Sequence, residues 1–159
     1  MKITVIAIGK IKEKFYKDAI AEYSKRLSRY CKLEIIEVLD EKTPDGISAR
    51  EENNIKDKEA QKVLNFLKND SYKIALDIKG NNYDSIGMSR KIHQLGVDSI
   101  GQITFIIGGS LGLSDKVLDI VNEKISFSNM TFPHQLMRVI LLEQIYRSFK
   151  IISKEPYHK

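Results

Sequence analysis

Short runs of apolar residues alternate along the chain with longer segments in which apolar residues recur every three or four positions. The short runs have the length and β-branched composition of buried strands, and the longer segments have the periodicity of amphipathic helices. The pattern predicts strands at 2–8, 33–39, 72–78, 102–107 and 124–127, and helices at 12–30, 49–68, 85–95, 115–121 and 133–152. Regular strand–helix alternation predicts an α/β domain with a mostly parallel sheet flanked by helices.

Two helix starts carry explicit signals. Ser48 and Glu51 are predicted to form a capping box, because each side chain can satisfy the other residue's free backbone N–H. Pro133 is expected at the first position of the last helix, where a backbone N–H is not needed. No repeat, low-complexity tract or linker divides the chain, so residues 1–159 are expected to form a single domain.

Composition narrows the class of protein. With 159 residues, of which 42% are hydrophobic, the chain is long enough to bury a core of its own. A single cysteine, Cys31, excludes an internal disulfide framework and fits a reducing compartment. The apolar run 3–8 is too short for the core of a signal peptide, and the most apolar helix is interrupted by Arg138 and Glu143. A soluble, cytoplasmic protein is therefore expected.

Positive charge is concentrated near the start of the chain. Residues 1–32 contain nine lysines and arginines against three acidic residues, whereas residues 40–59 contain seven acidic residues against four basic ones. The whole chain carries a formal net charge of +5. A basic end on a small domain is typical of a protein with a polyanionic partner, although an ordinary solvated helix face would carry the same residues.

A glycine-rich turn directly follows the predicted strand 102–107. The turn, GGSLG at 108–112, does not match the dinucleotide fingerprint G-x-G-x-x-G, and no Gly-Lys-Ser/Thr follows that would make a P-loop. Glycines at the end of a buried strand leave backbone groups open to a ligand, and this edge of a parallel sheet is where ligands bind. A second polar stretch lies at 126–131. The two loops predict a pocket for a flat heterocycle with a small charged tail, unless the turn serves only to reverse the chain.

Four ordered blocks of the sequence resemble one family closely. They are GGSLGL at 108–113, SFSNMTFPHQLMRV at 126–139, EQIYR at 143–147 and PYHK at 156–159. The opening residues 1–10 and the region 23–26 match as well. The pattern is similar to that of the ribosomal RNA large subunit methyltransferase H family, which belongs to the knotted methyltransferases called SPOUT, and the resemblance covers the whole chain.

The resemblance implies a SPOUT-type fold in which the C-terminal part, about 72–159, forms a trefoil knot that holds S-adenosylmethionine. Knots are otherwise nearly absent from proteins, so periodicity alone would not indicate one. Carried over residue by residue, the resemblance implies that strand ends and adjacent loops hold the methyl donor. These residues are Leu76, Gly108, Phe127, Ser128, Asn129, Met130, Thr131 and Phe132.

The implied reaction is methylation of 23S ribosomal RNA at N3 of a pseudouridine, in a stem-loop at the subunit interface of the assembled ribosome. N3 carries a proton that must leave, so a general base, or donors to the carbonyl oxygens of the nucleobase, would lower the barrier. The candidates are His158, Tyr157, Arg147, Glu143 and His134. Without the resemblance, the last residues would be read as a frayed tail, Glu143 and Arg147 as a surface i,i+4 pair, and His134 as part of a helix cap.

The basic residues near the start of the chain are the expected contacts to RNA phosphates. They are Lys10, Lys12, Lys14, Lys17, Lys25, Arg26 and Arg29, with Arg138 and Lys159 added from the last helix and the tail. The last helix is apolar on nearly every side, which indicates burial in a subunit interface or, alternatively, in the core of a monomer. The resemblance implies a homodimer in which the tail of one subunit reaches the partner's pocket.

Two other classes of function stay open. A non-catalytic ribosome- or RNA-binding factor could retain the methyl-donor pocket. A flavodoxin-like, nucleotide-dependent enzyme is disfavoured by the glycine spacing and by the lack of a ribose-binding acid. No metal site is expected, because one cysteine and three scattered histidines lack ligand spacing.

Overall fold

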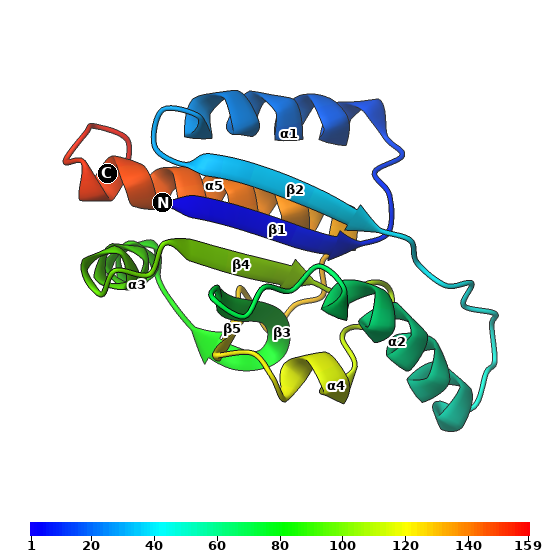
Figure 1. The fold of residues 1–159 in the computed structure, drawn as a ribbon. Helices are drawn as coiled ribbons and strands as arrows, with labels where there is room; N and C mark the ends of the chain where they lie inside the picture. Colours follow the sequence, from blue (N-terminus) through cyan, green and yellow to red (C-terminus); the bar gives the residue numbers. More distant parts are fainter.

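The computed structural model describes residues 1–159 and contains one sheet of five strands in the order β2-β1-β4-β3-β5 (Figure 1). The strands are β1 (Lys2–Ile8), β2 (Lys32–Val38), β3 (Tyr72–Asn82), β4 (Gln102–Ile107) and β5 (Glu123–Ser126). Every neighbouring pair is parallel, and Ile6 of β1 lies between Ile36 and Ile106. The predicted α/β fold with a parallel sheet is therefore confirmed. The apolar runs become strands because both faces of the sheet are covered.

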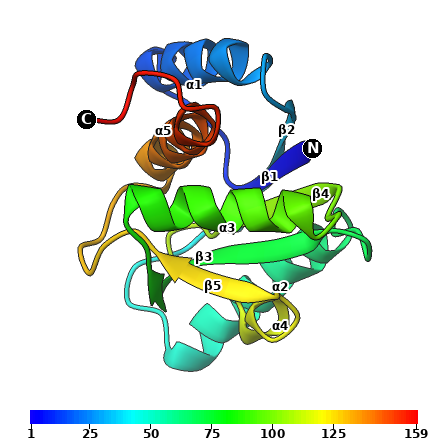
Figure 2. The ribbon, with the colours of Figure 1, turned by 90° about the vertical axis from the view of Figure 1, so that its left-hand side faces the viewer.

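Helices cover the sheet on both faces (Figure 2). They are α1 (Lys14–Leu27), α2 (Ala49–Leu64), α3 (Ser85–Val97), α4 (Asp115–Leu118) and α5 (His134–Ile152). Successive residues of a strand point to opposite faces of the sheet, so β1 contributes side chains to two hydrophobic cores. Val5 packs with residues of α1, α3 and α5, and Ile6 packs with residues of α2 and α4. None of the helices combines the length and the apolar character that crossing a membrane requires.

Most element boundaries lie within a few residues of the prediction, and the capping box is present. The backbone N–H of Ser48 donates to Oε2 of Glu51 at 2.7 Å, and the N–H of Glu51 donates to Oγ of Ser48 at 3.3 Å. Pro133 lies one position earlier than predicted, at the N-cap of α5, where its carbonyl accepts from the N–H of Met137. The helix α4 is a single turn, shorter than the predicted helix 115–121.

β3 is four residues longer than the predicted strand 72–78, because its register against β5 shifts partway along. Ile125 of β5 pairs with Leu76 and again with Asn81, so the chain bulges outward between these two residues. Gly80 lies in the bulge, and a Cβ atom there would be 2.6 Å from the backbone nitrogen of Ile125. Only glycine permits this approach. The strand order does not itself establish the trefoil knot, which stays a prediction.

The long helix α5 has two different faces. Its buried face packs between α1 and α3 and carries Leu141, Leu142 and Ile145. The opposite face carries a half-buried row that recurs at helical spacing: Leu136, Val139, Ile140, Glu143 and Arg147. One side of α5 therefore belongs to the core of the single chain, and the other side leaves apolar surface partly open.

Candidate functional site

A cavity of about 750 Å³ lies at the carboxyl ends of β3, β4 and β5, and we call it the strand-end cavity. Seven of the eight residues expected to hold a cofactor line it: Leu76, Gly108, Phe127, Ser128, Met130, Thr131 and Phe132. The eighth, Asn129, is exposed in the same loop and does not line the cavity. Asp77, His134 and Met137 line it as well. The structure thus brings together most of the expected cofactor-binding residues, which are spread over more than fifty positions of the sequence.

The glycine turn shapes one wall of the cavity. Gly112 donates its N–H to the carbonyl of Gly109 at 3.1 Å, which folds the turn back on itself. At Gly108 a Cβ atom would lie 2.7 Å from the carbonyl carbon of Gly112, so a side chain at this position would push the turn open. The absence of a side chain leaves the backbone groups of this wall accessible to a ligand.

The loop after β5 forms the facing wall and is held by its own hydrogen bonds. The hydroxyl of Ser126 donates to the carbonyl of Ser128 at 3.0 Å, and Oγ of Ser128 accepts from the N–H of Met130 at 3.0 Å. The side chain of Met130 is 74% exposed at the cavity rim, whereas Phe127 is half-buried. An apolar floor, open backbone groups and one carboxylate, Asp77, fit a flat heterocycle with a charged tail.

His134 lies at the mouth of the strand-end cavity, at the first residue of α5. Burial lowers the pKa of its imidazole, and the nearby Arg138 guanidinium lowers it further. The ring is therefore neutral near pH 7 and does not add positive charge to the cavity.

Arg138 was expected to contact RNA, and that prediction is wrong. Its side chain is 2% exposed and donates to the carbonyl of Ile8 at 3.2 Å and to that of Gly9 at 2.5 Å. Its Nη1 forms an ion pair with Glu37 at 2.7 Å. Burial lowers the pKa of the Arg138 guanidinium, but it remains charged because arginine does not lose its proton in proteins. It ties α5 to the ends of β1 and β2.

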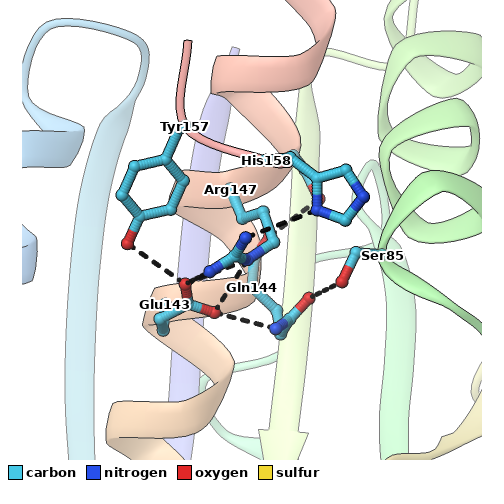
Figure 3. Close-up of polar contacts among 7 residues, drawn as sticks. Ser85, Glu143, Gln144, Arg147, Tyr157 and His158 are labelled. Carbon is cyan, nitrogen blue, oxygen red and sulfur yellow. Dashed lines mark hydrogen bonds and ion pairs between the residues drawn. The ribbon is translucent and has the colours of Figure 1, made fainter.

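Four of the five predicted catalytic residues meet in one group, which we call the tail cluster (Figure 3). Glu143 accepts hydrogen bonds from Nη2 of Arg147 at 2.7 Å and from the hydroxyl of Tyr157 at 3.2 Å. The Arg147 guanidinium also lies over the Tyr157 ring at 4.7 Å, and its Nη1 is 3.4 Å from Nδ1 of His158. These contacts hold the last residues of the chain against α5.

Tyr157 and Arg147 of the tail cluster have shifted pKa values. Partial burial, followed by the charge of Glu143, raises the pKa of Tyr157 to about 12. The hydrogen bond to Glu143 raises the pKa of Arg147. Tyr157 is thus a protonated donor near neutral pH, which excludes its phenolate as a base there.

Sequence reasoning assigned no role to two polar residues beside the tail cluster. Gln144 donates to Glu143 at 2.8 Å, and its Oε1 accepts from the hydroxyl of Ser85 at 2.8 Å (Figure 3). Gln144 stands inside the EQIYR block, which was the available signal, whereas nothing local marks Ser85. Both residues line a second hollow of about 300 Å³ that shares Ile125, Ser126 and Phe127 with the strand-end cavity.

His134 is not part of the tail cluster. It precedes Glu143 by nine residues of α5, which is about 14 Å along a helix axis. The chain end and the amino-terminal end of β1 lie at the same end of the molecule, whereas the strand-end cavity is at the carboxyl ends of the strands (Figure 1). The tail cluster and the strand-end cavity of one chain are therefore separated along α5.

The basic residues near the start of the chain are exposed, as an RNA contact requires. Two of them have acidic partners: Lys14 pairs with Asp18 at 2.6 Å and Arg26 pairs with Glu22 at 2.7 Å. The others are Lys10, Lys12, Lys17, Lys25 and Arg29, and Lys159 is also exposed. No group of three or more histidine, cysteine, aspartate or glutamate side chains is arranged to hold a metal ion.

Comparison with known proteins finds relatives along nearly the whole chain. A family model described as a predicted SPOUT methyltransferase matches residues 1–158. The ribosomal RNA large subunit methyltransferase H of Clostridium tetani is 58% identical over 159 residues, which cover both chains completely. The protein of the same name from Clostridium botulinum (strain Langeland) is 59% identical, also over the full length of both chains.

A solved structure shares the fold at low sequence identity. It is titled as that of a probable methylase family protein from Haemophilus influenzae Rd KW20, and it is 12% identical with a TM-score of 0.53. The match covers 99% of this chain and 70% of the other. Because the family model spans nearly the whole chain and both relatives match it from end to end, the chain belongs to the ribosomal RNA large subunit methyltransferase H family of SPOUT methyltransferases.

Proposed function

We propose that this protein transfers a methyl group from S-adenosylmethionine to large-subunit ribosomal RNA. The observation that carries the proposal is the strand-end cavity, in which the family's expected donor residues converge from β3, β4 and the loop after β5. The names of full-length relatives support the RNA substrate. Since the ribosome would be the substrate, the protein would act in the cytoplasm.

The residues of the strand-end cavity fit the methyl donor. The turn at Gly108 offers backbone groups that a side chain would block, and Leu76 and Phe127 provide apolar surface for an adenine ring. When bound, S-adenosylmethionine supplies a methyl group on a sulfonium, which is transferred to a nucleophile approaching in line. Because the imidazole of His134 is neutral, it does not repel the positively charged sulfonium of the donor. The carboxylate of Asp77 attracts that sulfonium.

The acceptor we propose is N3 of a pseudouridine in a 23S stem-loop at the ribosomal subunit interface. That stem-loop must present the base outside the helical stack, because N3 is otherwise occupied in pairing. The N3–H bond breaks and its proton passes to solvent water, while the N3–methyl bond forms and the donor leaves as the neutral thioether S-adenosylhomocysteine. Negative charge develops on the two carbonyl oxygens of the base as the N3 proton leaves. Side chains that donate hydrogen bonds to these oxygens would therefore accelerate the reaction.

The tail cluster would supply these donors. Nη1 of Arg147 lies 3.4 Å from Nδ1 of His158, and because arginine can only donate, Nε2 is the ring nitrogen that would donate to a carbonyl oxygen. Tyr157 keeps its proton because of the raised pKa. Glu143 accepts from Arg147, Tyr157 and Gln144, and so it orients these side chains.

A homodimer would bring the tail cluster to a strand-end cavity. Within one chain, His134 of the cavity and Glu143 of the tail cluster are nine residues apart on α5, whereas the half-buried face of α5 carries Leu136 and Ile140 next to Glu143. A two-fold contact through this face would bury the apolar residues and carry the tail of one protomer toward its partner. The exposed lysines near the start of the chain would then contact RNA phosphates, with the steep salt dependence that such contacts produce.

The alternative is a non-catalytic ribosome-binding factor that retains the donor pocket. The two functions are separated by transfer of labelled methyl groups to intact 70S ribosomes, separated subunits and free 23S RNA. We expect label in the large-subunit RNA with the wild-type protein. His158→Ala should lose most transfer but retain donor binding by calorimetry, and Gly108→Ala should lose both. Donor binding without transfer to any of the particles would favour the binding factor.

A further inference from the structure

A large aromatic side chain is exposed at the start of α1. Phe15 is 65% exposed, and its ring lies 4.3 Å, centroid to centroid, from the ring of Tyr16 at an angle of 54°. The tilted contact with Tyr16 restrains the Phe15 ring on the surface. Leaving a phenyl ring in water forgoes the free energy that burial would provide, so an exposed and supported ring is a candidate binding surface.

Positive charge surrounds this ring. Four lysines lie in the segment 10–17, which we call the platform segment: Lys10, Lys12, Lys14 and Lys17. Glu13 is the one acidic residue within it, and Asp18 just beyond it is engaged by Lys14 at 2.6 Å. An exposed aromatic ring among lysines matches single-stranded nucleic acid, whose phosphates contact the charges while a base stacks on the ring.

Hydrogen bonds fix the platform segment beside the strand-end cavity. The N–H of Lys12 donates to Oε1 of Gln135 at 3.1 Å, and the N–H of Ile11 donates to Oε2 of Glu37 at 2.7 Å. The same carboxylate oxygen pairs with Arg138 at 2.7 Å. Gln135 follows His134, which lines the mouth of the cavity. The start of α1 and the start of α5 accordingly lie at the same end of the molecule (Figure 1).

We propose that Phe15, supported by Tyr16, is a stacking platform for an unpaired nucleobase of the RNA substrate, and that Lys10, Lys12 and Lys17 hold the adjoining phosphates. This inference rests on the proposed function and adds to it a site that holds the RNA strand near the methylated nucleotide. The platform segment is bonded to the residue next to the cavity mouth, so a base stacked on Phe15 would neighbour the base being methylated.

A second copy of the chain is the competing occupant, and charge disfavours it. A two-fold contact centred on Phe15 would place this lysine-rich surface opposite itself, where like charges repel. The half-buried apolar face of α5 offers a more suitable contact for a second copy.

The test compares three substitutions in the full-length protein: Phe15→Ala, Phe15→Leu and Phe15→Trp. Binding to intact ribosomes and to a short unstructured oligoribonucleotide is measured by fluorescence anisotropy over a range of salt concentrations. We expect Ala and Leu to weaken binding between about fivefold and a hundredfold, as is typical of one lost stacking contact, and Trp to preserve it. The slope of affinity against salt should stay the same in all three, whereas Lys12→Gln should reduce it.

Three results would overturn the platform. They are wild-type affinity in Phe15→Ala, wild-type affinity in Phe15→Leu, and a change of oligomeric state in Phe15→Ala by analytical ultracentrifugation. The last would assign the ring to an interface between copies. Donor affinity, measured by calorimetry, should be unaffected in every Phe15 variant. If the wild type bound RNA through Phe15 but transferred no methyl group, the proposed reaction would fail and the platform would stand.

Discussion

The side chain of Arg138 shows how one buried charge organises the region beside the strand-end cavity. It binds the carbonyls at the end of β1 and the carboxylate of Glu37 at the end of β2. Glu37 in turn accepts from the backbone of Ile11. A buried cation without its counter-ion still carries the full free-energy cost of desolvation. Breaking the pair of Arg138 and Glu37 should therefore cost more stability than breaking an ion pair on the surface.

Glu37→Gln should lower the free energy of unfolding by about 1–3 kcal/mol, because it leaves the buried Arg138 with a neutral partner. The matched control is Glu34→Gln on the same strand, which breaks a more exposed pair with Lys2 and should cost less than about 1 kcal/mol. Urea unfolding of both variants, with an unchanged m-value, makes the measurement. Equal losses in the two variants would contradict the role given to Arg138.

The lowered pKa of His134 makes part of the stability depend on pH. As pH falls, the unfolded chain takes up this proton first, so the stability contribution is complete above about pH 6.5 and is lost as pH falls through the pKa of the folded state. Stability should therefore decline from pH 7 to pH 5, and His134→Asn should reduce that decline. Urea unfolding at the two pH values tests this, with the exposed His93→Asn as control. An unchanged decline in the His134 variant would contradict the burial argument.

Among the elements, β3 and β5 set the position of the loop that faces the glycine turn. Gly80→Ala would place a methyl group 2.6 Å from the backbone of β5, so the pairing of Asn81 and Asn82 with β5 should break. We expect a loss of stability above about 2 kcal/mol and a clear loss of donor affinity, since the loop begins where β5 ends. Gly101→Ala meets no atom within 4 Å and should leave both properties close to those of the wild type. Calorimetry and urea unfolding of the pair test the account, and normal donor binding in Gly80→Ala would be inconsistent with it.

The helices and strands also show how much of the fold could be predicted from the sequence. Buried parallel strands appear as continuous apolar runs, so all five strands and the parallel sheet were predictable. The extension of β3 was not, because Asp77, Lys79 and Gly80 read as a strand end and their pairing depends on a distant segment. Arg138 recurs at helical spacing with Leu141 and Ile145, which signals a buried face, but its partner Glu37 is visible only in three dimensions.

Less of the candidate site than of the fold could be predicted from the sequence. The glycine turn marks a ligand pocket by itself, whereas the tail cluster was indicated only by resemblance to a family. Tyr157 and His158 follow the end of α5, and no local pattern predicts that they fold back onto Glu143 and Arg147. Charge alone also could not separate Arg138 from the exposed lysines, because its burial depends on how the strands and α5 pack.

For the whole molecule, we expect a working site to combine two protomers. Gly108→Ala impairs the strand-end cavity and His158→Ala impairs the tail cluster, so each variant alone should be nearly inactive. When they are mixed and allowed to exchange subunits, each heterodimer regains one intact site. The mixture should then recover about a quarter of the wild-type rate. No recovery, with subunit exchange verified by mass, would mean that one chain builds its own site.

The central claim is methyl transfer from S-adenosylmethionine to a defined nucleotide of the large-subunit RNA. It is tested most directly by incubating undermodified ribosomes with the protein and a deuterated methyl donor, and then mapping the heavy methyl group by mass spectrometry of nuclease fragments. We expect one labelled pseudouridine, modified at N3, and no label with His158→Ala. Ribosomal RNA free of label, from a wild-type protein shown to bind the donor, would contradict it.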